Sequence, residues 1–130
     1  MIIDSSVIVA ILRREGEADA FGAAMDQAPI RRISAVNYVE AAVVIDSRRD
    51  PLVSRAFDDL LRQSQTIIEP VTPEQAKLAR ETYLLYGKGR HRAGLNLGDC
   101  FAYALAKDKG EPLLFKGDDF KKTDAEIAEY

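Results

Sequence analysis

Short apolar runs alternate along the chain with longer segments in which apolar residues recur at helical spacing. Met1–Ile3 and Pro112–Phe115 are continuous apolar runs, which are typical of strands buried on both faces of a parallel sheet. Two more short strands are expected, at Ile30–Ile33 and at 66–71. Pro70 places the second of these near a sheet edge, because proline cannot donate a hydrogen bond to a strand ladder.

Helices are predicted between these strands, and several begin at a Ser, Thr or Pro and end near a Gly. They cover residues 6–14, 17–27, 35–48, 51–64, 73–86 and 97–109. The first is entered through Ser5 or Ser6 as cap, and a capping box at Thr123 and Glu126 predicts one more short helix. Because strands alternate with helices, we expect one α/β domain over residues 1–130, with a mainly parallel sheet between two layers of helices.

Composition excludes several classes of protein. The chain has 130 residues and 47% hydrophobic content, enough for one domain with a real core. Its 21 acidic and 18 basic residues give a net charge of −3, so a nucleic-acid partner would need a local basic patch or a metal ion. Cys100 is the only cysteine, which rules out an internal disulfide. No apolar run is long enough for a membrane span and no basic signal-peptide start is present, so we expect a cytoplasmic protein.

Three acidic residues stand where a buried or capping residue is expected. Asp4 ends the first strand, and α/β proteins place their chemistry at the carboxyl ends of strands. Glu40 interrupts the apolar stripe of the helix 35–48, formed by Val36, Val39, Val43 and Val44, so it is either a rim residue or part of a site. Asp99 begins a helix, where an acid is either a cap or, beside Asn96 and Gly98, a site residue.

A second group of acids follows the last strand. Asp118 and Asp119 repeat the position of Asp4, although one of them could simply form a turn, and Asp124 follows the Thr123 cap. Carboxylates that converge on one point repel one another and need protons or a divalent cation. Oxygen ligands suit Mg²⁺ or Mn²⁺ rather than zinc, and such ions activate water and neutralise charge on phosphates. The residues alone therefore indicate a metal-dependent phosphodiesterase or phosphatase.

Four segments together resemble the PIN-domain ribonucleases, and more narrowly the VapC toxins of prokaryotic toxin–antitoxin pairs. They are MIIDSS at 1–6, YVEA at 38–41, YGKGRHRAGLNLGDCFAYALAK at 86–107 and PLLFKGDDFKKTD at 112–124. The resemblance extends over the whole chain in order and spacing. It implies a PIN-like three-layer α/β/α fold.

The resemblance also implies the residues of the site. It makes Asp4, Glu40, Asp99 and Asp119 the catalytic and metal-binding acids. The supporting residues are Ser5, Ser6, Asp118 and Asp124, with Asp118 secondary to Asp119, which precedes the phenylalanine. The implied activity is endonucleolytic cleavage of RNA with Mg²⁺, for which Mn²⁺ can substitute. The implied partners are a VapB-type antitoxin and a second copy of the chain in a homodimer.

A basic cluster near Asp99 predicts where RNA binds. Lys88, Arg90, His91 and Arg92 lie in a glycine-bounded loop, and Lys116, with Lys121 and Lys122, flanks the late acids. Such a local stripe lets an acidic protein bind phosphates. His91 is expected to contact substrate at most, not to act as a base.

Three alternatives remain at this point. A HAD-like phosphatase also begins with a strand ending in Asp, but it needs a second acid two residues later, where this chain has Ser6. A receiver domain needs an early acid pair that is absent here. A catalytically silent PIN-like module would bind RNA or protein without cleaving it.

Overall fold

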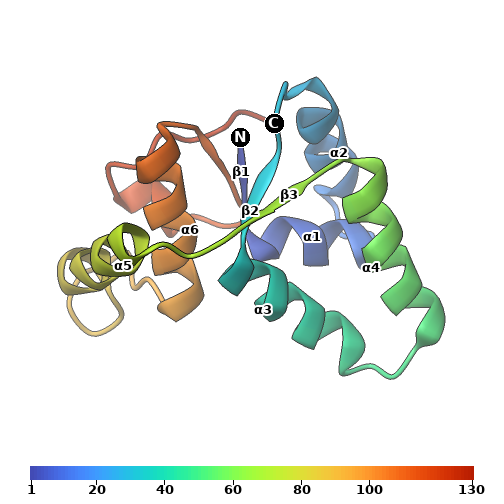
Figure 1. The fold of residues 1–130 in the computed structure, drawn as a ribbon, viewed down its shortest axis with the longest axis horizontal. Coiled ribbons are helices and arrows are strands. Elements are labelled where there is room, and N and C mark those ends of the chain that lie inside the picture. Colours follow the sequence, from blue (N-terminus) through green and yellow to red (C-terminus); the bar gives the residue numbers. More distant parts are fainter.

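A four-stranded parallel sheet lies at the centre of the molecule, in a computed structural model that describes residues 1–130 (Figure 1). Its strand order is β3-β2-β1-β4, and every pairing is parallel. The strands are β1 (Ile2–Ile3), β2 (Arg32–Ser34), β3 (Ile67–Glu69) and β4 (Leu113–Leu114). The predicted parallel sheet is confirmed, and β3 lies at the edge and ends before Pro70, as proline requires.

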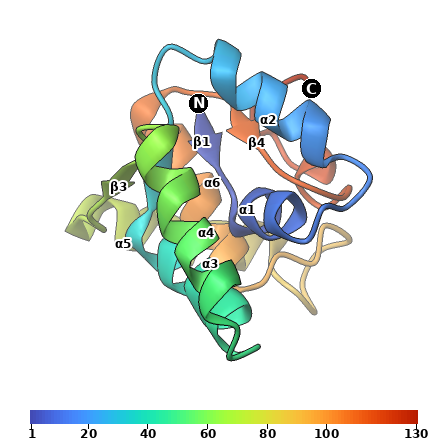
Figure 2. The same cartoon turned by 90° about the vertical axis from the view of Figure 1, so that its right-hand side faces the viewer.

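Six helices cover the two faces of the sheet. They are α1 (Ser5–Leu12), α2 (Ala18–Gln27), α3 (Ala35–Asp46), α4 (Pro51–Gln63), α5 (Pro73–Tyr86) and α6 (Leu97–Lys109). Helices α1 to α4 lie on one side of the strands and α5 and α6 on the other (Figures 1 and 2). None of these helices combines the length and apolarity that a membrane span requires.

Alternating side chains of the strands divide the core into two parts. Ile3, Ile33 and Leu114 are buried in one cluster with residues of α1 to α4. Ile2 and Leu113 are buried in the other cluster with residues of α5 and α6. Neighbouring strand residues point to opposite faces. This explains why β1 and β4 are apolar at every position.

Two predictions about helices are wrong. The stripe of α3 does not face the core, because Val39 and Val43 are 55% and 62% exposed while Asn37, Ala41 and Ile45 are buried. The buried face of α3 is rotated by about one residue from the stripe of valines that the sequence indicates. No helix follows Thr123; a 3₁₀ turn, η1 (Phe120–Lys122), precedes it instead.

The chain after Thr123 joins the sheet instead of forming a helix. The Leu113 amide donates to the Glu126 carbonyl at 2.9 Å, and the Ala128 amide donates to the Leu113 carbonyl at 2.9 Å. A parallel bridge pairs Leu113 with Ile127. These bonds satisfy the outer edge of β4, which a helix could not do.

Helix caps follow the sequence closely except at α1. Ser34 caps α3, and Thr72 caps α5 with Pro in its first turn, as the sequence predicts. The cap of α1 is Asp4 itself, whose carboxylate accepts from the Ser6 amide, and not Ser5 or Ser6. The residue that ends β1 therefore also starts α1.

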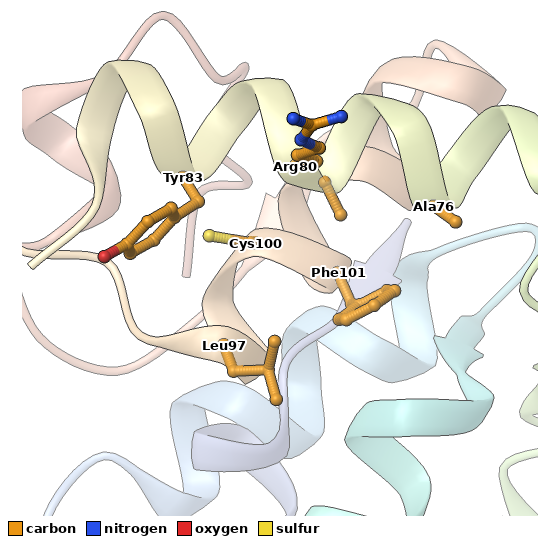
Figure 3. A pocket seen from close by; sticks show the side chains of 7 residues that line it. Ala76, Arg80, Tyr83, Leu97, Cys100 and Phe101 are labelled. Carbon is orange, nitrogen blue, oxygen red and sulfur yellow. The ribbon is translucent and has the colours of Figure 1, made fainter.

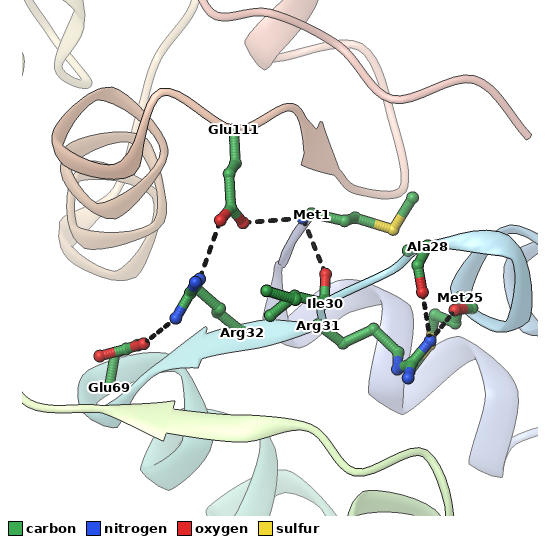
Figure 4. A network of polar contacts seen from close by, with 8 residues as sticks. All are labelled: Met1, Met25, Ala28, Ile30, Arg31, Arg32, Glu69 and Glu111. Atoms are coloured by element: carbon green, nitrogen blue, oxygen red, sulfur yellow. Dashed lines mark hydrogen bonds and ion pairs between the residues drawn. The ribbon is translucent and has the colours of Figure 1, made fainter.

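A polar network links strand β2 to its surroundings (Figure 4). The Arg32 guanidinium contacts Glu69 at 2.6 Å and Glu111 at 2.9 Å. Glu111 also accepts from the Met1 amino group at 2.8 Å. The neighbouring Arg31 donates to the carbonyls of Met25, in the last turn of α2, and Ala28, which follows that helix. This network links β3 and β2 to the segments just before β1 and β4, and these are the two strands that Asp4 and the loop of Asp119 follow.

Candidate metal centre

Asp4 is a buried carboxylate with one oxygen left free. It is 3% exposed, and its Oδ2 accepts from the Ser6 amide at 3.0 Å, whereas its Oδ1 has no hydrogen-bond partner. Burial raises the pKa of Asp4 above its usual value, and the nearby charge of Glu40 raises it further. A buried, unpartnered carboxylate oxygen is costly unless a ligand completes it.

Glu40 reaches from α3 toward the start of α6. Its carboxylate accepts from the Ser5 hydroxyl and, at 3.4 Å, from the Asn37 side-chain amide. It packs so closely on the backbone of α6 that a Cβ placed on Gly98 would lie 2.6 Å from Glu40 Cδ. Glu40 is half-buried, and its charge raises the pKa of both Asp4 and Asp99.

Asp99 lies in the first turn of α6, where it is part of a capping box. The Asn96 side chain accepts from the Asp99 amide at 2.8 Å, and the Asp99 carboxylate accepts from the Asn96 amide at 3.0 Å. Burial raises the pKa of Asp99 to about 7, and the charges of Asp4, Asp119 and Glu40 add to the effect. Capping therefore does not exclude a site role. The pKa of this carboxyl responds to all three other candidate acids.

The structure separates Asp119 from its neighbour Asp118. The Asp118 carboxylate is 75% exposed and pairs with Lys121 at 3.0 Å, which lowers its pKa. Asp119, by contrast, is close enough for its charge to act on Asp99. The loop that carries both is attached to α1, because the Lys116 amide donates to the Ser6 hydroxyl at 3.0 Å.

The two serines therefore support different acids. Ser5 donates to Glu40, while Ser6 bonds to Asp4 through its amide and to the loop of Asp119 through its hydroxyl. The resemblance implied only that Ser5 or Ser6 supports the first acid.

The donor set fits a divalent cation such as Mg²⁺. All four acids carry oxygen donors that could bind such an ion, one of them is buried with a free oxygen, and a cation would relieve their mutual repulsion. No three acidic, histidine or cysteine side chains are grouped closely enough to form a ready-made metal shell. Binding an ion would therefore draw these carboxylates together.

Asp124 lies outside this cluster. Its carboxylate accepts from the Tyr103 hydroxyl and contacts Lys107 at 3.1 Å, both on α6, and it is not among the charges that act on Asp99. The bond from Tyr103 lowers the pKa of Asp124. Its role in the structure is to attach the C-terminal segment to α6.

The predicted RNA-binding residues differ in their contacts: Lys88 and Arg92 form no ion pair, the Arg90 guanidinium lies 5.4 Å from the centre of the Tyr83 ring, and His91 and Lys116 have polar partners in the protein. Lys88, Arg90 and Arg92 are exposed in the loop between α5 and α6, the loop that leads into Asp99. His91 packs edge-on against Tyr86, and its Nδ1 accepts from the Ala93 amide at 3.0 Å. Lys116 pairs with Glu15 and, at 3.3 Å, with Glu17, which offsets its charge.

Asn37 is a residue of the candidate site that the sequence did not indicate. Asn37 is fully buried on α3 and donates to the Gly98 carbonyl at 2.9 Å. The available signal was spacing, since Asn37 stands three residues before Glu40 and so shares its face of the helix.

The largest apolar groove is separate from the acids. It measures about 380 Å³ and lies between α5 and α6 (Figure 3). Its lining residues are Ala76, Ala79, Arg80, Tyr83, Leu97, Cys100 and Phe101. Burial raises the pKa of the Cys100 thiol to about 11, so this cysteine is a core residue rather than a nucleophile.

Comparison with known proteins identifies the class of this fold and site. The family model of the PIN domain matches residues 1–126, so the chain belongs to the PIN domain family. The receiver domain and the HAD-like phosphatase are thereby excluded.

Relatives within the family narrow this further. The chain is 51% identical over 129 residues to Ribonuclease VapC28 of Mycobacterium tuberculosis, covering 98% of this chain and 97% of that protein. At this identity it belongs to the VapC group of PIN domain proteins.

Solved structures agree on the fold. The crystal structure of VapC20 of Mycobacterium tuberculosis, a sarcin–ricin loop cleaving toxin, has a TM-score of 0.76 at 16% identity, with 95% of each chain covered. A toxin–antitoxin complex from Klebsiella pneumoniae has a TM-score of 0.75 at 18% identity, covering 99% of this chain and 97% of that one.

Proposed function

We propose that the chain is a Mg²⁺-dependent endoribonuclease that acts in the cytoplasm as the toxin of a toxin–antitoxin pair. The observation that carries this proposal is the buried Asp4 carboxylate, which has one unpartnered oxygen and lies near enough to Glu40 and Asp99 for their charges to affect one another's pKa, with Asp119 acting on Asp99 as well. Its membership of the PIN domain family and its 51% identity to a VapC ribonuclease support an RNA substrate.

In this mechanism Asp4, Glu40, Asp99 and Asp119 would hold the ion. When bound, the metal orients and activates a water and neutralises charge that develops on the phosphoryl oxygens. Asp99 must lose its proton to bind the ion, and its raised pKa of about 7 means that this proton is released near neutral pH. Lys88, Arg90 and Arg92 contact backbone phosphates beside the site, which compensates for the net negative charge of the chain.

The proposal includes two protein partners. An antitoxin would cover the acids. The fold likeness to a toxin–antitoxin complex supports this, as do the exposed Val39 and Val43 on the helix that carries Glu40. A basic side chain of that partner would neutralise the carboxylates in place of the metal. A homodimer would bury the apolar groove between α5 and α6, beside which Leu97 is 74% exposed. Sedimentation of the free chain tests the dimer.

The proposed activity is tested with two neighbouring acids as a matched pair. Asp119→Asn should lower Mg²⁺-dependent cleavage of structured RNA at least a hundredfold, as should Asp4→Asn, because each removes a metal ligand. Asp118→Asn should remain within about threefold of wild type, since its carboxylate is exposed and paired with Lys121. Equal activity of Asp4→Asn and wild type would identify a contaminating nuclease. Wild type that binds RNA but cleaves none with Mg²⁺ or Mn²⁺ would support the silent module instead.

A further inference from the structure

Asn37 is a fully buried polar side chain on α3 whose hydrogen bonds run to the candidate site. Its Nδ2 donates to the Gly98 carbonyl at 2.9 Å and, more weakly, to Glu40 Oε1 at 3.4 Å. Its Oδ1 has no partner. Burying an amide oxygen without a hydrogen-bond partner costs free energy. The hydrogen bonds that the Asn37 NH₂ group donates must offset this cost for an asparagine to occupy the position.

The orientation of this amide is fixed by chemistry. If the amide turned over, Oδ1 would face the Gly98 carbonyl and the Glu40 carboxylate, and both of these are acceptors. Asn37 can therefore act only as a donor toward these two groups. Hydrophobic packing alone would be better served by an apolar residue, which would leave no buried oxygen unsatisfied.

The two groups that Asn37 bonds belong to different candidate ligands. Glu40 is one turn further along α3, and Gly98 precedes Asp99 in the first turn of α6. Both bonds to Glu40, from Ser5 and from Asn37, fall on Oε1. The other oxygen, Oε2, lies against Gly98. Asn37 thus links the backbone just before Asp99 to the side chain of Glu40, and the carboxylates of these two residues repel each other.

We propose that Asn37 is a positioning residue of the metal centre, which keeps the first turn of α6 against Glu40 so that Asp99 and Glu40 can bind one cation. This rests on the proposed function, since it assumes that these acids bind a metal. Without the amide, repulsion between the two carboxylates would move the start of α6 away from α3. The ion would then have to draw them back, so affinity falls.

The test is binding of Mn²⁺ by the full chain, measured by calorimetry without RNA. Asn37→Leu keeps the side-chain size but cannot donate, and we expect it to weaken the Mn²⁺ dissociation constant about 10–100-fold, the usual cost of losing a group that orients a metal ligand. The matched control is Gln75→Met. Gln75 is also a buried amide that donates to α6, but at Asp108 near the other end of that helix, at 3.0 Å.

The results separate three outcomes. The positioning role is supported if Asn37→Leu binds Mn²⁺ more weakly than wild type while Gln75→Met keeps the wild-type affinity, the two variants having lost a similar amount of melting temperature. Mn²⁺ affinity of Asn37→Leu within twofold of wild type overturns it and makes Asn37 a purely structural residue. Wild type that binds no Mn²⁺, like Asp4→Asn, overturns the metal part of the proposed function instead.

A measurement on the unaltered protein covers the case in which Asn37→Leu does not fold. In a Mg²⁺ titration followed by NMR, the side-chain amide signals of Asn37 should shift with the midpoint of metal binding. Those of Gln75 should stay constant. Asn37 signals that do not respond while Mg²⁺ binds contradict the proposal.

Discussion

Gly98→Ala should impair the proposed metal centre of this VapC-type PIN domain while leaving its fold nearly as stable as before. A Cβ at this position would lie 2.6 Å from both Cδ and Oε1 of Glu40, a separation that real Cβ atoms do not show. The clash involves the end of a flexible side chain and no backbone, so Glu40 moves and the helix stays in place. Moving Glu40 breaks its bonds to Ser5 and Asn37.

The change in stability is the difference between two effects of similar size. Ala in place of Gly in a helix is stabilising by roughly 0.5–1 kcal/mol. Two lost hydrogen bonds cost about 1 kcal/mol each, and less here because the Asn37 bond is long and Glu40 can reach water. The net free energy of unfolding should therefore change by no more than about 1 kcal/mol, whereas metal affinity should fall about 10–100-fold.

Gly22→Ala is the matched control, because Gly22 lies within α2 and a Cβ there would meet nothing within 4 Å. It should gain about 0.5–1 kcal/mol with unchanged cleavage. Urea unfolding in EDTA gives the stabilities, and cleavage of RNA across a Mg²⁺ series gives the apparent metal affinity. Gly98→Ala with the Mg²⁺ dependence of wild type would refute the packing of Glu40 on α6. Gly98→Ala that fails to fold would show that Glu40 cannot move aside.

Two further predictions follow from the titrating groups. Metal-free protein should lose stability as pH rises from about 4 to about 7, because Asp99 holds its proton to about pH 7 when folded but only to about 3.8 when unfolded. The full shift corresponds to about 4 kcal/mol, and partial exposure reduces this to about 2 kcal/mol. Thermal unfolding in EDTA should show this fall in stability with pH, and Asp99→Asn should make stability nearly independent of pH over the same range. A stability that rises with pH over this range would contradict the prediction. Tyr103→Phe should cost about 1 kcal/mol in urea unfolding and leave RNA cleavage within twofold, since the Tyr103 hydroxyl bonds only Asp124 outside the site; a tenfold loss of cleavage would return Asp124 to the site.

The sequence predicted the fold correctly where a residue pattern is compatible with only one local structure. Continuous apolar runs gave β1 and β4, because both faces of those strands are buried. Ser34 and Thr72 gave helix starts, because their hydroxyls accept from free amides. Asp4 was found because an acid after a buried run has few structural explanations.

The sequence was misleading where two explanations use the same residues. Valines at helical spacing in α3 indicated a core face, yet Val39 and Val43 are exposed, and periodicity does not distinguish a core from a partner surface. Thr123 is a capping residue by type, but its hydroxyl accepts from the Ala125 amide in a turn because the following residues pair with β4. That pairing is a long-range effect, which no local pattern contains.

The first turn of α1 explains how four repelling acids stay together in the metal-free chain. Asp4 caps this helix, Ser5 donates to Glu40, and the Ser6 hydroxyl accepts from the Lys116 amide in the loop before Asp119. This single turn thus begins at Asp4, donates a hydrogen bond to Glu40 and holds the loop that carries Asp119. Asn37 attaches the fourth, through the carbonyl before Asp99. Hydroxyl and amide groups supply these contacts and no lysine or arginine side chain does, so no cation of the chain itself would compete with a metal for these carboxylates. A lysine or arginine in place of Ser5 or Asn37 would stabilise the metal-free cluster and compete with the ion, which is why hydroxyl and amide groups suit these positions.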